Sequence, residues 1–115
     1  MGKIKIKFGK KTSYLPIKRT SFFGKAFGLM FKSRNTDSLL FDFREDTNAR
    51  IHSIFVFFPF LAIWLDDKNN VKEWSVISPF RFHISSPESF RKIVEVPLNS
   101  KNRQIVEFFV GSRKV

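Results

Sequence analysis

Lys3-Ile4-Lys5-Ile6-Lys7-Phe8, close to the start of the chain, alternates strictly between a lysine and a large apolar residue. Successive side chains of a strand point to opposite faces, so this stretch predicts a strand with three lysines on one face and apolar residues on the other. Turn-forming residues follow at positions 9–12. Residues 13–19 then predict the return strand of a hairpin, in which Pro16 favours an edge position or a bulge.

The same kind of pattern recurs along the rest of the chain, with turn signals about every ten residues. Residues 44–48 are expected to form a polar loop, Pro59 to break two buried strands, and residues 67–70 to form a hairpin turn. The further predicted strands are residues 38–43, 50–57, 60–66, 71–78, 79–84, 93–96 and 104–110. We therefore expect at least seven strands in a mostly β (β-rich α+β) compact single domain over residues 1–115, a barrel or a sandwich with one short helix.

That helix is expected within residues 20–31. Thr20 and Ser21 offer an N-cap, and the apolar residues that follow have helical spacing with one broad stripe. Gly24 and Gly28 weaken a helix by about 1 kcal/mol each relative to alanine, so this one would depend on tertiary packing. The side chains expected in the core are Phe27, Met30, Phe41, Phe43, Ile63, Phe80 and Phe82.

Composition narrows the class of protein. The chain has no cysteine, which excludes a disulfide scaffold, a thiol nucleophile and a cysteine zinc site. Its longest apolar run, residues 54–65, is interrupted by Pro59 and is shorter than the roughly 20 residues of a transmembrane helix. Residues 1–8 show no apolar signal segment. The expected location is therefore cytoplasmic.

Positive charge is concentrated at one end of the chain. Residues 1–36 hold ten lysines and arginines and no acidic residue, whereas the rest hold eleven bases and ten acids. A field of one sign attracts polyanions such as nucleic acid, although a basic face also serves solubility alone. The candidate polyanion-binding residues are Lys3, Lys5, Lys7, Lys25 and Lys32. Tyr14 is the one aromatic residue there that the expected core leaves available for stacking, so binding would be weak, indifferent to sequence and steeply salt-dependent.

A second candidate site is polar and cationic. His52 and Ser53 interrupt an otherwise apolar predicted strand, and Arg81 and His83 share one face of another. If these faces meet in a cleft, a guanidinium and imidazole donors would bind a small anion. Two simpler interpretations stay open: His52 as a hydrogen-bonded core histidine, and Arg81 with His83 as the solvent face of an edge strand.

Catalytic signatures are nearly absent from the sequence. There is no glycine-rich phosphate loop and no Gly-x-Ser-x-Gly elbow, and two histidines would need carboxylates to complete a metal site. We expect no cofactor and no metal, and a non-enzymatic binding or accessory domain as the leading function. The enzymatic alternative pairs Glu95 or Asp66 with His52 for general acid–base work, as in a hydrolase.

Four blocks of sequence occur in a specific order: Gly28-Leu29-Met30-Phe31-Lys32, Leu39-Leu40-Phe41-Asp42-Phe43, Phe57-Phe58-Pro59-Phe60 leading to Trp64-Leu65-Asp66, and Ile93-Val94-Glu95-Val96-Pro97. Over roughly residues 20–110, this order resembles the uncharacterised family known as domain of unknown function 192, in its archaeal-type branch. The resemblance implies a compact, mostly β fold and a small cytoplasmic protein, and it implies no activity.

The chain departs from this family at the positions that would line a polar pocket. The family's Asn, Thr and Asp correspond here to Phe55, Val56 and Leu61, and Lys32 replaces the arginine that follows Gly-Leu-Met in the family. The resemblance therefore implies a fold without carrying over a polar site.

Overall fold

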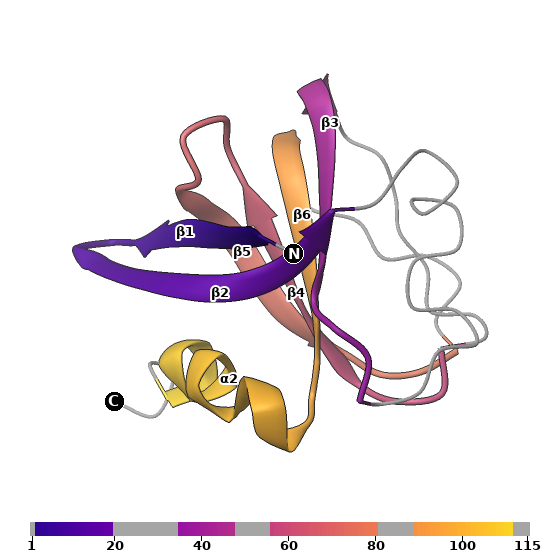
Figure 1. The fold of residues 1–115 in the computed structure, drawn as a ribbon. Coiled ribbons are helices and arrows are strands. Elements are labelled where there is room, and N and C mark those ends of the chain that lie inside the picture. The colour runs from indigo at the N-terminus through magenta and orange to yellow at the C-terminus, as the bar shows by residue number, and fades with distance from the viewer. Residues whose placement is uncertain (1, 20–34, 48–55, 81–88, 112–115) are drawn as a thin grey trace.

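One curled sheet forms the frame of the protein in the computed structural model, which describes residues 2–19, 35–47, 56–80 and 89–111 (Figure 1). Within these residues the sheet has six strands in the order β1-β2-β3-β6-β4-β5. The elements are β1 Gly2–Phe8, β2 Lys11–Arg19, β3 Leu39–Thr47, β4 Phe60–Leu65, β5 Val71–Ile77, β6 Phe90–Pro97, the 3-10 turn η1 Ser100–Asn102 and helix α2 Arg103–Val110. The mostly β prediction is confirmed, and the described residues form a half-barrel with one short helix, α2.

Strands β1 and β2 form the hairpin that the lysine alternation predicts. They pair antiparallel from Gly2↔Ile17 to Phe8↔Lys11. Gly9, in the turn, has φ of 63°, a left-handed conformation that glycine adopts without a steric penalty. The hairpin joins the rest of the sheet through a short parallel pairing of β2 with β3, at Lys18↔Leu39 and Arg19↔Leu40.

The other four strands form an antiparallel unit with β6 between β3 and β4. The sheet curls until its two edges touch, because the backbone N–H of Lys7 in β1 donates to the carbonyl of Asn69, 2.9 Å away, in the turn before β5. A parallel bridge between Lys7 and Asn70 adds to this contact. Figure 1 shows the result, with the hairpin curving away from the upright strands and α2 lying beside it.

Curling gives the sheet two faces with separate cores. The concave face carries the inner core, to which all six strands and α2 contribute. Its buried residues are Ile4, Ile6, Leu15, Ile17, Leu40, Leu61, Ile63, Leu65, Trp74, Val94, Val96, Ile105 and Phe109. The convex face of β3, β6, β4 and β5 carries the outer layer. Its buried residues are Leu39, Phe41, Val56, Phe58, Phe60, Ala62, Trp64, Ile77, Phe90 and Ile93.

Residues 104–110, predicted as a strand, belong to helix α2, so that prediction is wrong. The β-branched and aromatic residues favour a strand by propensity, but their spacing also suits a helix. Ile105 and Phe109, four positions apart, both pack into the inner core, where the Phe109 ring centroid lies 5.6 Å from that of Trp74 and 5.2 Å from that of Phe8. Burial of this one face outweighs strand propensity.

Side-chain hydrogen bonds hold η1, the 3-10 turn that leads into α2. The Asn99 side chain caps this turn by accepting from the backbone N–H of Asn102 at 3.1 Å. The Asn102 amide donates to the Pro97 carbonyl at 2.8 Å and lies within 3.5 Å of the Ser38 hydroxyl. These contacts tie the helix to the end of β6 and to the start of β3.

Two local predictions for the strands and turns also need correction. The polar loop expected at 44–48 is partly strand, because β3 runs to Thr47 with an irregular register after Asp42 and a left-handed Arg44. The strand expected at 79–84 does not begin at Pro79, since residues 79 and 80 form a turn. Phe80 is 56% exposed rather than buried, with φ of 64° and its ring centroid 5.5 Å from that of Phe57.

Among the other expected core residues, Phe41 and Ile63 are buried, as predicted, whereas Phe43 is only half-buried and packs against the outer layer. The predicted helix at 20–31, nearly all of the strand at 50–57, and Phe27, Met30 and Phe82 lie outside the described residues.

Candidate nucleic-acid interface

The convex face of the hairpin is built from alternating lysines. Ile4 and Ile6 are buried in the inner core, so Lys3, Lys5 and Lys7 face the opposite way. Lys3 and Lys5 are exposed and Lys7 is half-buried. Consecutive lysines of this row have backbone positions roughly 6.5–7 Å apart, as alternate residues of a strand do.

Across the ladder, β2 completes this face with uncharged residues. Pro16 lies opposite Lys3, Tyr14 opposite Lys5, and Thr12 opposite Lys7. Tyr14 is 64% exposed, in the middle of the hairpin face. We call this surface the lysine face; its residues are Lys3, Lys5, Lys7, Thr12, Tyr14 and Pro16.

The hairpin that carries the lysine face has charged residues of one sign only. No acidic residue occurs among residues 2–19, and Lys10, Lys11, Lys18 and Arg19 at the two ends of the hairpin are all exposed. None of the lysines on the face forms an ion pair with another described residue. An ion pair elsewhere joins Lys101 to Asp37 at 3.9 Å, near the start of α2.

The structure brings together three of the five predicted polyanion-binding residues, Lys3, Lys5 and Lys7. Lys25 and Lys32 lie outside the described residues. So do all four residues of the predicted small-anion site, His52, Ser53, Arg81 and His83. The placement of Tyr14 directly opposite Lys5 could have been predicted from the sequence by assuming a two-residue turn at Gly9 and Lys10.

A buried carboxyl group lies on the convex face of the central strands. Glu95 of β6 is 6% exposed, between Leu39 of β3 and Ala62 of β4. Burial raises the pKa of Glu95 to about 8, so this side chain is mostly protonated at neutral pH. Two residue pairs along the ladder, on the same face, the buried indole Nε1–H of Trp64 has no hydrogen-bond partner among the described residues.

Glu95 is one of the two carboxylates named for acid–base chemistry with His52, and a raised pKa is common at functional sites. Its predicted partner His52 lies outside the described residues, so this pairing stays a prediction.

Asp66, the other carboxylate, organises a turn. It accepts hydrogen bonds from the backbone N–H groups of Lys68 and Asn70, both at 2.8 Å, and from the Asn70 side chain at 3.0 Å. Partial burial alone would raise the pKa of Asp66, but these hydrogen bonds and the charge of Lys72 outweigh it and lower the pKa. The arrangement confirms the turn predicted at 67–70 and gives Asp66 a structural role.

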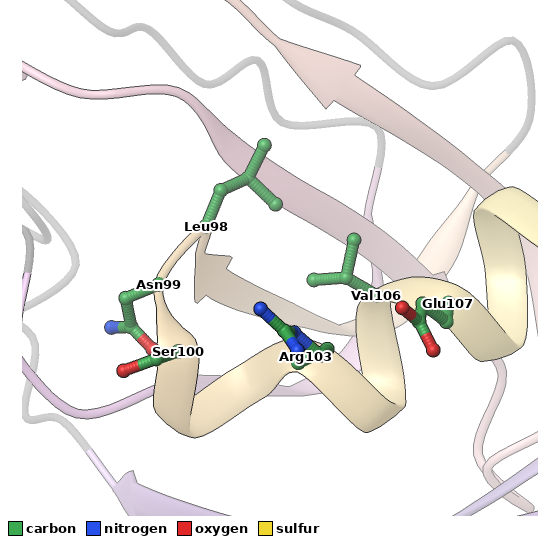
Figure 2. A pocket seen from close by; sticks show the side chains of 6 residues that line it. All are labelled: Leu98, Asn99, Ser100, Arg103, Val106 and Glu107. Atoms are coloured by element: carbon green, nitrogen blue, oxygen red, sulfur yellow. The ribbon is translucent and has the colours of Figure 1, made fainter.

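A shallow hollow of about 330 Å³ lies where β6 leads into α2, lined by Leu98, Asn99, Ser100, Arg103, Val106 and Glu107 (Figure 2). Arg103 and Glu107 stand one helical turn apart with opposite charges, so the hollow lacks the single sign of the lysine face. In the described segments no three histidine, cysteine or carboxylate side chains gather as metal ligands, and no helix there is long and apolar enough to cross a membrane.

Solved structures share this fold. A putative transcription regulator from Sinorhizobium meliloti aligns with a TM-score of 0.73 and 17% identity, over 89% of this chain and 82% of its own. A protein of unknown function from Novosphingobium aromaticivorans aligns with a TM-score of 0.70 and 14% identity, over 90% of this chain and 77% of its own. No protein-family model and no curated protein matches the chain. At such identities the likeness shows the fold alone.

Proposed function

We propose that this chain is a non-enzymatic nucleic-acid-binding domain whose lysine face contacts the phosphate backbone without reading base sequence. The observation that supports this most directly is the row of Lys3, Lys5 and Lys7 on one outward face of β1. A strand holds such a row at regular spacing, and phosphates of a nucleic-acid backbone also repeat regularly. Lysines act toward phosphates as point charges, which position a partner without identifying its bases.

The absence of acidic residues from residues 2–19 supports the same proposal. An acid among the lysines would pair with one of them and repel phosphate. A hairpin whose own charged residues are all positive instead raises the rate of encounter with polyanions. The proposal keeps the cytoplasmic location that the sequence predicts.

The comparisons add modest support. One protein with this fold, from Sinorhizobium meliloti, is described as a putative transcription regulator. The resemblance to domain of unknown function 192 stays a prediction and brings no activity with it.

The test is a titration with a random-sequence oligonucleotide at about 50 and about 200 mM salt, across which phosphate contacts change affinity by orders of magnitude. The variant Lys3→Gln/Lys5→Gln/Lys7→Gln removes three positive charges from the lysine face. We expect it to weaken binding strongly at low salt and to reduce the slope of log affinity against log salt by about two to three.

The matched control removes three positive charges elsewhere, in Lys72→Gln/Lys101→Gln/Arg103→Gln. All three positions are exposed, in β5, in η1 and in α2. Both variants change the net charge equally, so only a local interface makes the first lose more affinity than the second. Equal losses, or no binding by the unmodified protein at the lower salt, would contradict the proposal.

The small-anion site of His52, Ser53, Arg81 and His83 stays a separate prediction. A thermal-shift screen with phosphorylated metabolites and nucleotides would test whether this site binds a small anion. Equal shifts for the unmodified protein and Arg81→Ala would remove Arg81 from the site.

A further inference from the structure

We propose that the lysine face takes single-stranded rather than duplex nucleic acid, with Tyr14 as a stacking platform for one unpaired base. This inference rests on the proposed function and narrows its substrate class. It follows from the position of one aromatic ring among the lysines, which contact with phosphates alone does not require.

Tyr14 differs in its exposure from Phe8, the other aromatic residue of the hairpin. Phe8, on β1, packs against the inner core, where its ring centroid is 5.2 Å from that of Phe109. Tyr14 is 64% exposed. Its neighbours on the same face of β2 are Thr12 and Pro16, whose side chains are smaller than a tyrosine ring. A planar side chain that is left open in the middle of a strand pair is available to stack on another planar group.

The lysines surround this ring in a useful arrangement. Lys5 is directly opposite Tyr14, at the roughly 4.5–5.5 Å between Cβ atoms that facing residues have. Lys3 and Lys7 are the diagonal neighbours, with backbone positions roughly 13 Å from each other along β1. A nucleotide whose base stacks on Tyr14 therefore has a lysine beside it and a further lysine toward each neighbouring phosphate.

Base stacking on a protein side chain selects for single strands. In a duplex each base is stacked between its neighbours and paired, so its flat face is not available to an outside ring. In a single strand every base exposes such a face, and aromatic platforms bind it with little preference for sequence. A duplex still contacts the lysines through its phosphates. Single-stranded and duplex nucleic acid should therefore both bind, with the single strand bound more tightly.

An anionic membrane is the other polyanionic partner that a basic face with a tyrosine suits. Membrane-binding faces also carry large aliphatic or aromatic side chains that enter the lipid. The lysine face presents Tyr14 among lysines, a threonine and a proline. The large apolar residues of the same strand, Ile4 and Ile6, are buried on the opposite face. The composition of the face therefore favours nucleic acid.

The first measurement is the affinity at about 50 mM salt for a single-stranded oligonucleotide of about 12 nucleotides and for the matching duplex. Tyr14→Leu replaces the ring by an aliphatic side chain, and Tyr14→Phe keeps the ring without its hydroxyl. We expect Tyr14→Leu to weaken single-strand binding roughly tenfold and to leave duplex binding nearly unchanged, and Tyr14→Phe to bind like the unmodified protein. Because Tyr14 is exposed, thermal unfolding should show that both variants remain folded.

The second measurement uses the fact that Tyr14 is the only tyrosine in the chain. Labelling tyrosine rings for NMR therefore gives the signals of this one side chain in the full-length protein. Stacking of a base places the ring protons in the shielding region of the base. We expect these signals to move upfield with the single strand and to stay near their free positions with the duplex.

The outcomes separate the two proposals. The single-strand proposal is wrong if Tyr14→Leu binds single strand and duplex with the affinities of the unmodified protein. It is also wrong if Tyr14→Leu loses the same factor of affinity for both. The loss of binding in Lys3→Gln/Lys5→Gln/Lys7→Gln would then still support the proposed function. If the tyrosine signals and the affinity respond to vesicles of anionic phospholipid and not to either nucleic acid, both proposals are overturned.

Discussion

The convex face of the sheet has two halves that belong to one continuous sheet and differ in the side chains that point outward. On the hairpin this face carries Lys3, Lys5, Lys7 and an exposed Tyr14, whereas on the central strands it carries the apolar outer layer. The change occurs at a single ladder pair, where Lys18 of β2 lies beside Leu39 of β3. Both halves keep apolar residues on the concave face, so strand alternation is the same throughout. The outward positions alone distinguish a surface that meets solvent from one that packs inside the protein.

The largest expected difference between the halves is in the effect of deleting an aromatic ring. Phe60→Ala in the outer layer, where Phe60 is fully buried, should lower the free energy of unfolding by about 3–5 kcal/mol. Tyr14→Ala on the lysine face should change it by no more than about 0.5 kcal/mol. Chemical denaturation of the two variants measures both values. Similar losses would show that the hairpin face is also a packed layer.

Glu95 is the exception within the buried half, because it can ionise. Its effect on stability should therefore depend on pH. The pKa of Glu95 is raised from its ordinary value of 4.5 to about 8 by burial, so the folded state holds a proton that the unfolded state releases. Its contribution to stability is therefore complete below about pH 4.5 and is lost as the pH rises toward about 8. Between about pH 5.5 and 7.5 this group should remove roughly 2–3 kcal/mol from the free energy of unfolding.

Glu95→Gln is the variant that isolates this effect, because glutamine has a similar shape and does not titrate in this range. Denaturation of both proteins across the same pH values cancels the contribution of all other groups. We expect the free energy of unfolding of the glutamine variant, relative to that of the unmodified protein, to increase steadily as the pH rises. Parallel stability curves would mean that Glu95 is already ionised in the folded protein.

The turn at Asp66 joins the two halves at the edge of the sheet, and its loss should have an intermediate effect. Asp66→Ala removes the acceptor for the backbone N–H groups of Lys68 and Asn70, which should destabilise the fold by about 1–2 kcal/mol. Because the pKa of Asp66 is lowered, its contribution is present above the ordinary value of 3.8 and is lost as the pH falls below it. Thermal unfolding of Asp66→Ala at neutral and acidic pH checks both statements. If the variant lost the same stability at both pH values, the expected pH dependence would be wrong.

The smallest expected effect on stability is at the centre of the lysine face. Lys5→Ala should leave the free energy of unfolding within about 0.5 kcal/mol of the unmodified value, since Lys5 is exposed and surrounded by like charges. A gain in stability would still fit, because removal of a lysine relieves repulsion. A loss above about 1 kcal/mol in denaturation would show that Lys5 has a structural role.

Alternation predicted the parts of this fold in which one face is buried and the other is not. It placed Lys3, Lys5 and Lys7 together because the period of a strand is two and Ile4 and Ile6 need a core. It was wrong for α2, where a run rich in β-branched and aromatic residues fits the period of a strand and also that of a helix. The contacts of Ile105 and Phe109 with the inner core favour the helix.

Other features depend on distant strands and have no local signal. The burial of Glu95 is set by Leu39 and Ala62, which are far from it in sequence and lie beside it only once β6 is placed between β3 and β4. Phe80 resembles a core phenylalanine by type and periodicity, yet its left-handed backbone at a turn leaves it exposed. Composition favours burial of a phenylalanine without determining where the chain turns.

The short seam between the hairpin and the rest of the sheet has a consequence for local opening of the backbone. Strand β2 meets β3 at two residue pairs, and β1 meets the β4–β5 turn through Lys7. Central strands such as β6 have ladder partners on both sides along most of their length. Amide hydrogens of the hairpin should therefore exchange with solvent through a partial opening that leaves the central strands protected. A partner bound along the lysine face would slow that exchange on the hairpin first, so exchange rates would map the binding surface without any substitution.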